Sequence, residues 1–248
     1  MFKQSAQHVG TYYAATYGEI PLRARLEGRE DAQILIIGGG FSGLHTALRL
    51  ALAGKKVVLL EASRLAWAAS GRNGGQALPG WSCDMPPFEK ALGLERARQL
   101  WDSMTWAAKE MRELPERHGF DIDYRTGAIY TAVLPRRVRL LQENLEEAEQ
   151  KYGYQQLSFI PKNELPKWIA SPRYLAALHD AGAAHLNPLK LAQGLADAIE
   201  KAGGRIFEQS QVLDYRETAE GYVARTEHGE VRGDVLVLAC NAYIDRLD

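Results

Sequence analysis

Apolar and polar positions along residues 33–61 follow the order strand, helix, strand. Four consecutive apolar residues at 34–37 predict a buried strand, and residues 57–60 repeat that pattern. Between them, apolar residues recur at the i, i+3, i+4 spacing of an amphipathic helix, which Gly54 ends. These residues are Leu44, Ala47, Leu48, Ala51 and Leu52. The stretch therefore predicts the βαβ unit of a nucleotide-binding α/β domain.

The turn between the first strand and the helix has the glycine spacing of a dinucleotide-binding site. Gly38, Gly40 and Gly43 occupy the three positions of G-x-G-x-x-G. The first glycine permits the tight turn, the second allows a pyrophosphate close to the backbone, and the third lets the helix pack near the strands. The free N–H groups and the positive dipole end of the helix are then expected to face the phosphates.

An acidic residue, Glu61, stands at the carboxyl end of the second strand. Its carboxylate can accept hydrogen bonds from the hydroxyls of an adenosine ribose, and it would repel a 2′-phosphate. FAD and NAD are therefore favoured over NADP. The loop that follows is rich in Gly, Ser and Asn, and Ser70 to Gln76 offer polar groups at the sheet edge where ligands bind.

The pattern beyond this unit predicts an insertion into the α/β domain. Helices are predicted over 87–118 (closed by Pro115 and Gly119), 136–152 and 188–202, and strands over 126–134, 205–208 and 234–240. A short antiparallel meander is predicted at 213–217, 222–227 and 230–232, whereas 153–187, with three prolines, is predicted to be irregular. We therefore expect an α/β, Rossmann-like domain of residues 1–86 and 188–248. Residues 87–187 are expected to form the start of a second, α+β domain with one clear strand.

Composition excludes several classes of partner. A chain of 248 residues with 46% hydrophobic content can form one or two domains with a sizeable core. The 30 basic and 31 acidic residues leave a net charge of −1, so nothing favours nucleic acid or an anionic membrane. No apolar run is long enough for a membrane span, and the first residues lack the apolar core of a signal peptide. A cytoplasmic protein is expected.

The cysteines and the first 32 residues add two smaller expectations. Cys83 and Cys240 are predicted to be buried thiols of a reducing compartment rather than a disulfide. Residues 1–32 are predicted to form an arm packed over the domain. The alternative is that one of the tyrosines at 12, 13 and 17 reaches the mouth of an active site.

Four stretches together resemble the FAD-dependent amine and amino-acid oxidases of the D-amino-acid oxidase type. They are IIGGGFSGL at 36–44 followed by Glu61, ASGRNGGQ at 69–76, HLNP at 185–188 and VLVLACNAY at 235–243. The first is shared by many flavoproteins, whereas the second and fourth together are far more specific. Within the family, the chain looks most like the gamma-glutamylputrescine oxidases.

The resemblance implies a set of cofactor-binding residues. Gly38, Gly40, Phe41, Ser42 and Gly43 would lie against the pyrophosphate, and Glu61 would hold the ribose with Ala62 and Arg64 nearby. Ser70, Arg72, Asn73, Gly74, Gly75 and Gln76 would follow the ribityl chain and the isoalloxazine ring, and Val212 would contact adenine. Ala68 stands where relatives usually carry glycine.

The implied reaction oxidises the C–N bond of a small-molecule amine or amino acid by hydride transfer from its α-carbon to the flavin. No catalytic residue and no metal are assigned, His45 and His185 are expected to be structural, and the oligomeric state is left open. Relatives continue well beyond the position of Asp248, and the resemblance implies that residues 87–187 are an incomplete α+β substrate domain. Residues 1–248 alone are therefore not expected to form a competent oxidase. An NAD-dependent dehydrogenase and a non-catalytic nucleotide-binding fragment remain as alternatives.

Overall fold

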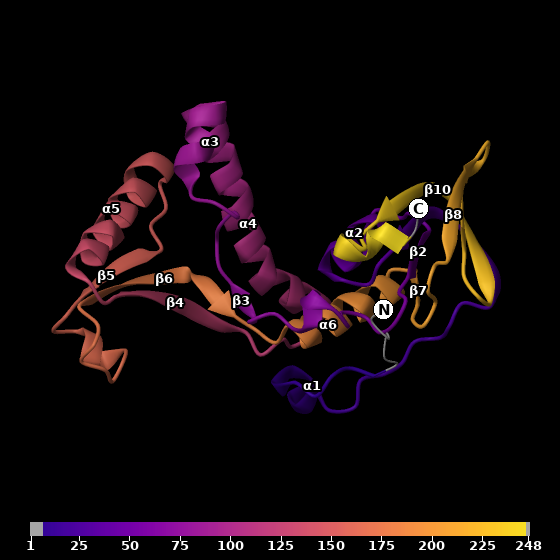
Figure 1. Ribbon diagram of the computed structural model, residues 1–248, viewed down its shortest axis with the longest axis horizontal. Helices are drawn as coiled ribbons and strands as arrows, with labels where there is room; N and C mark the ends of the chain where they lie inside the picture. The colour runs from indigo at the N-terminus through magenta and orange to yellow at the C-terminus, as the bar shows by residue number, and fades with distance from the viewer. Residues whose placement is uncertain (1–6, 247–248) are drawn as a thin grey trace. The chain divides into compact units, whose positions relative to one another are not determined.

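The computed structural model describes residues 7–246, which belong to two compact units (Figure 1). The first unit contains the residues up to Gly74, Phe120–Ile122 and the residues from Asn187 onward. The second contains Gly75–Gly119 and Asp123–Leu186. The division after Gly74 precedes the expected boundary at residue 86, because Gln76 and Ala77 form β3 and pair with a strand of the second unit.

A six-stranded sheet in the order β7-β2-β1-β10-β9-β8 forms the centre of the first unit. The strands are β1 (Gly28–Ile37), β2 (Val57–Leu60), β7 (Arg205–Phe207), β8 (Asp214–Thr218), β9 (Gly221–Arg225) and β10 (Gly229–Leu238). The neighbouring strands β7, β2, β1 and β10 are parallel to one another. Strand β9 pairs antiparallel with β10, and β8 pairs antiparallel with β9. The predicted α/β class with a parallel sheet is confirmed.

Strand β10 corrects one prediction. The third arm of the meander and the apolar strand after it, predicted as separate strands, form one continuous strand. It runs parallel to β1 along its whole length, and its first half also pairs antiparallel with β9. The change in polarity at 234 therefore marks the point where β10 loses one neighbour, not the end of a strand.

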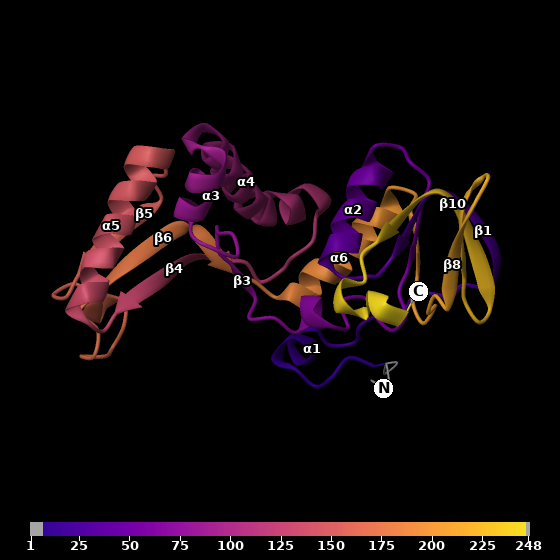
Figure 2. The same ribbon diagram turned by 45° about the horizontal axis from the view of Figure 1, so that its top comes forward.

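Two helices, α2 (Phe41–Leu52) and α6 (Pro188–Lys201), pack against each other in the first unit (Figure 2). Both bury apolar side chains, among them Leu44, Leu48, Leu195 and Ile199. Asn187 caps α6, because its side-chain oxygen accepts hydrogen bonds from the amides of Leu189 and Lys190. The arm before β1 carries a short helix, α1 (Tyr12–Tyr17), which also contacts α6.

The second unit contains a four-stranded sheet in which β6 (Ala176–His185) is central. It pairs antiparallel with β3, β4 (Arg125–Ala132) and β5 (Leu157–Pro161). The predictions of an irregular 153–187 and of a single strand were therefore wrong. The stretch AALHDAGAAH has weak intrinsic strand preference, and its pairing on both sides decides its conformation.

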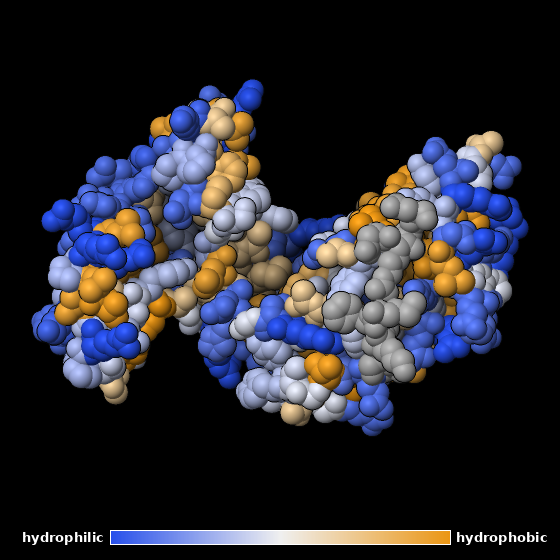
Figure 3. Space-filling view, viewed as in Figure 1, coloured by the Kyte–Doolittle hydropathy of each residue, from blue (hydrophilic) through white to orange (hydrophobic). Residues whose placement is uncertain are grey.

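Helices α3 (Met85–Leu92), α4 (Leu94–His118) and α5 (Pro135–Tyr152) and the short turn η2 (Leu165–Lys167) complete the second unit. Pro115 lies inside α4 instead of ending it, and Gly119 is the C-terminal cap, with a φ of +72°. The outward face of α5 is hydrophilic, as its amphipathic pattern predicts (Figure 3). Among residues 7–246, no helix is long and apolar enough to span a membrane.

The cysteine prediction is partly corrected. Both cysteines are free thiols, but Cys83 is exposed and only Cys240 is partly buried.

Candidate functional site

A cavity of about 380 Å³ lies in the first unit at the carboxyl ends of β1, β2 and β10. Five stretches line it: 37–42, 60–62, 66–70, 210–212 and 239–243. Its volume lies within the range of about 300–1,000 Å³ that is usual for small-molecule sites. The position also agrees with the rule that ligands bind outside the carboxyl ends of strands in open α/β sheets.

Glycines form the side of the cavity where β1 turns into α2. Gly38 has a φ of +113°, and a Cβ atom there would lie 2.5 Å from the backbone oxygen of Ala239. A Cβ atom on Gly43 would overlap the backbone oxygen of Gly38. Gly40 is the N-cap residue of α2, and it lines the cavity together with Phe41 and Ser42. The positive end of this helix therefore faces the cavity. Close backbone packing therefore fixes the glycine turn on this side.

The carboxylate of Glu61 projects from the end of β2 toward the glycine turn. One of its oxygens accepts a hydrogen bond from the amide of Gly39 at 2.7 Å, and the other accepts one from the amide of Ser63 at 2.8 Å. Burial raises the pKa of Glu61, although these two amides oppose the shift. Because a carboxylate offers about four acceptor positions, Glu61 can still accept bonds from a ligand.

The short helical turn η1 (Ala69–Gly71) closes the cavity near the start of α2. The hydroxyl oxygen of Ser70 accepts a hydrogen bond from the amide of Phe41 at 3.0 Å. The amide group of Asn73 donates to the carbonyl oxygens of Ala69 and Ser70, at 3.3 and 2.9 Å. Asn73 therefore stabilises the turn that presents Ser70.

The structure brings about half of the predicted cofactor residues to this cavity. Those that line it are Gly38, Gly40, Phe41, Ser42, Glu61, Ala62, Ser70 and Val212. The remaining ones, Gly43, Arg64, Arg72, Asn73, Gly74, Gly75 and Gln76, lie outside the lining formed by the described residues. Gly75 and Gln76 belong to the second unit. Their contact with a cofactor stays a prediction.

Arg64 and Arg72 have other partners in the structure. Arg64 is 7% exposed, and its guanidinium group pairs with the carboxylate of Glu208 at 3.1 Å. It also donates to the carbonyl oxygens of Ile20 and Pro21. The guanidinium group of Arg72 lies over the ring of Trp67, 4.2 Å from its centroid.

Several lining residues had no individual role in the sequence analysis. Among them are Ala66, Trp67, Ser210 and Gln211, and Cys240, predicted only as a buried thiol, also lines the cavity. The thiol of Cys240 donates to the carbonyl oxygen of Ile37, and burial raises its pKa. Ser210 and Gln211 directly precede Val212, so their proximity to a Val212 contact was the one local signal for them. None of the arm's tyrosines at 12, 13 and 17 lines this cavity.

Comparison with known proteins identifies the family. The sequence model named DAO, FAD dependent oxidoreductase, matches residues 33–248. The chain belongs to this family. Its cofactor is FAD, so the family match decides against the NAD-dependent alternative.

Comparisons with individual proteins extend this finding. Gamma-glutamylputrescine oxidoreductase of Escherichia coli is 39% identical over 96% of this chain and 55% of its own length. The probable oxidoreductase OrdL of Haemophilus influenzae is 35% identical over 97% of this chain and 56% of its own length. The structure of glycine oxidase from Geobacillus kaustophilus superposes with a TM-score of 0.70 at 23% identity, covering 88% of this chain and 57% of that one. The chain spans about half the length of the curated relatives it matches.

The cavity has chemistry that suits the pyrophosphate and adenosine parts of FAD. The N-terminus of α2 supplies positive potential for a pyrophosphate. The Glu61 carboxylate supplies acceptors for ribose hydroxyls, and side chains such as Val212 and Ala66 supply an apolar wall. The residues present therefore fit the cofactor of the family.

Proposed function

We propose that the protein binds FAD in the cavity of the first unit and that the complete enzyme oxidises the C–N bond of an amine or amino acid. The observation that carries this proposal is that Glu61 and the N-terminus of α2 meet at one cavity, in a member of an FAD-dependent family. The relative that is 39% identical makes gamma-glutamylputrescine the first substrate to test.

Each side of the cavity has a proposed role. Gly38, Gly40 and the N-terminus of α2 would hold the pyrophosphate, because the positive end of this helix lies at the cavity. Glu61 would accept hydrogen bonds from the ribose hydroxyls, and Val212 would contact the adenine. Ser70 would direct the loop that follows it toward the flavin end.

When bound, FAD would supply the two-electron acceptor for oxidation of the carbon next to the amine nitrogen. The residues of this chain would bind and orient it. The apolar groups of Ala66, Trp67 and Ala239 would limit water around it, because they line the same cavity.

Anaerobic reduction of the bound flavin tests the proposal. The complete protein would be purified, and its absorbance near the flavin maximum would be followed after addition of gamma-glutamylputrescine, putrescine or glycine. We expect a flavin spectrum that bleaches fastest with gamma-glutamylputrescine. A protein that bleaches only with glycine would support the oxidase but not the substrate. A protein that binds no flavin would contradict the proposal as a whole.

A further inference from the structure

The carboxylate of Glu208 is completely buried, with 0% exposure. Glu208 is the first residue after β7. One of its oxygens accepts hydrogen bonds from the amide of Leu65 at 2.6 Å and from the guanidinium group of Arg64 at 3.1 Å. The other accepts one from the amide of Arg23 at 2.8 Å. A buried charge is stable only when it is paired and hydrogen-bonded, and both conditions hold here.

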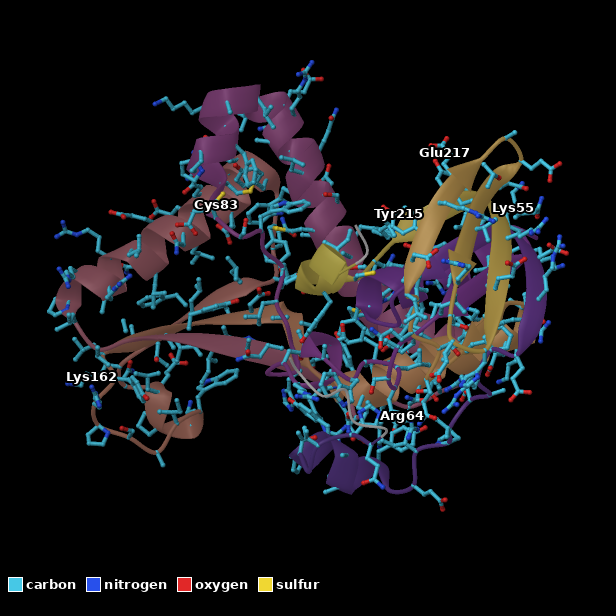
Figure 4. The ribbon with its side chains drawn as sticks, turned by 45° about the vertical axis from the view of Figure 1, so that its right-hand side comes forward. Lys55, Arg64, Cys83, Lys162, Tyr215 and Glu217 are labelled. Atoms are coloured by element: carbon cyan, nitrogen blue, oxygen red, sulfur yellow. The ribbon has the colours of Figure 1, made fainter. Side chains whose placement is uncertain are left out.

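These bonds join three segments that are distant in the sequence. Leu65 and Arg64 belong to the loop after β2, Arg23 belongs to the arm before β1, and Glu208 leads to the cavity residues 210–212. Arg64, which lies beside the arm in Figure 4, donates to the carbonyl oxygens of Ile20 and Pro21 at 3.1 and 2.8 Å. Hydrogen bonds therefore hold the arm before β1 against the loop after β2, which lines the cavity.

The side chain of Arg23 fastens the arm to α6 as well. Its guanidinium group bonds the side chains of Gln193 at 2.8 Å, Asp197 at 2.6 Å and Glu200 at 3.2 Å. Leu26 adds a further connection, because its amide donates to the hydroxyl oxygen of Ser210 at 2.9 Å. Ser210, which lines the cavity, in turn donates from its hydroxyl to the carbonyl oxygen of Glu208.

The backbone on both sides of these contacts is held in a conformation that side chains disfavour. Ala66, next to Leu65, has a φ of +55°, and Gln209, next to Glu208, has a φ of +51°. Non-glycine residues keep such angles when the surrounding structure over-determines them. The amide of Gln209 also donates to the carbonyl oxygen of Ser63 at 2.9 Å. The Glu208 contacts are therefore placed where they can hold both strained turns.

We propose that Glu208 is a positioning residue of the cofactor cavity. Its carboxylate, paired with Arg64, holds residues 62–67 and 209–212 in the conformation that receives the adenosine half of FAD. This inference rests on the proposed function for its consequence in FAD binding. The positioning itself can be measured without cofactor.

The test compares Glu208→Gln with the wild-type chain and with Glu217→Gln. Glu217 is an exposed glutamate on the β8–β9 hairpin of the same unit, so its replacement removes the same charge without a buried partner (Figure 4). In the cofactor-free protein, hydrogen–deuterium exchange at 62–67 and 209–212 should accelerate in Glu208→Gln, while exchange at 34–37 and 57–60 should not change. The Kd for FAD should rise about tenfold or more, as expected when a charge-assisted hydrogen bond is lost. The control should match the wild type.

Two results would overturn the proposal: unchanged exchange at both segments, or acceleration that is equal in 34–37 and 57–60, which a merely structural role would give. If Glu208→Gln fails to fold, Arg64→Lys keeps the positive charge but loses the hydrogen bonds from Nη2 to the carbonyl oxygens of Ile20 and Pro21. It should then show the same local acceleration, and its absence would equally contradict the proposal. If the wild-type chain binds no FAD, the proposed function fails, while the exchange data still decide the role of Glu208.

Discussion

The two sides of the cavity are shaped by different means. On the glycine side, residues 38–43, the backbone makes the surface, and a Cβ atom on Gly38 or Gly43 would meet another backbone atom. On the acidic side, residues 61–67 and 208–212, carboxylate and hydroxyl groups hold separate segments together. A clash with a backbone atom cannot be relieved by moving a side chain, whereas hydrogen bonds can be removed one at a time. A side chain added at Gly38 or Gly43 should therefore disrupt the fold of this unit, whereas single substitutions on the acidic side should weaken FAD binding stepwise.

The largest effect is expected from Gly43→Val. The new Cβ atom would overlap the carbonyl oxygen of Gly38, and neither backbone segment can move without shifting β1 or α2. We expect a loss of about 3 kcal/mol or more in the free energy of unfolding, at the upper end for overpacking. Urea unfolding would measure it. Gly80→Val is the matched control, because nothing lies within 4 Å of a Cβ atom there. Equal stability of the two variants would contradict the steric role of Gly43.

A smaller and more specific effect is expected from Glu61→Ala. The variant loses the acceptors for the ribose as well as those for the amides of Gly39 and Ser63. FAD binding should weaken by about 1.5–3 kcal/mol, the range for hydrogen bonds to a charged group. Flavin fluorescence titration would measure it, with Glu61→Gln as an intermediate variant that keeps one acceptor oxygen. An unchanged Kd in Glu61→Ala would refute the ribose role.

The smallest effect concerns pH. Because burial raises the pKa of Glu61, this group binds its proton more tightly in the folded, cofactor-free protein than in the unfolded chain. Its contribution to stability is therefore largest below the ordinary value of 4.5 and is lost as the pH rises through the raised pKa. Ribose hydroxyls would favour the ionised form, so FAD affinity should increase with pH over the same interval. FAD titrations at a series of pH values across this interval should show affinity that increases with pH in the wild type. In Glu61→Gln the affinity should not depend on pH over the same interval.

The glycine side could be predicted from the sequence because its contacts are local. The strand, the glycine turn, the helix and the second strand lie within residues 33–61, and their hydrophobic periods agree with one another. The same holds for the predicted helix start at 188, because Pro188 itself occupies the first turn of α6.

The acidic side could be predicted only in part. Glu61 follows directly from its place after β2, whereas Glu208 reaches partners 143, 144 and 185 positions away. No periodicity connects such positions, so nothing in the sequence indicates that Arg64 pairs with Glu208. Strand β6 was not predicted because it depends on distant partners as well. Its neighbours β3, β4 and β5 come from separate parts of the chain.

The assignment of the cavity to FAD is tested most directly by hydrogen–deuterium exchange of the chain with and without saturating cofactor. Binding in the described cavity predicts protection of residues 38–43 on the glycine side and of 61–67 and 210–212 on the acidic side. Residues 157–161 and 176–185 of the second unit should exchange as in the free chain. Protection confined to the second unit, or saturable binding that leaves 38–43 and 61–67 unprotected, would contradict the assignment of this cavity to FAD.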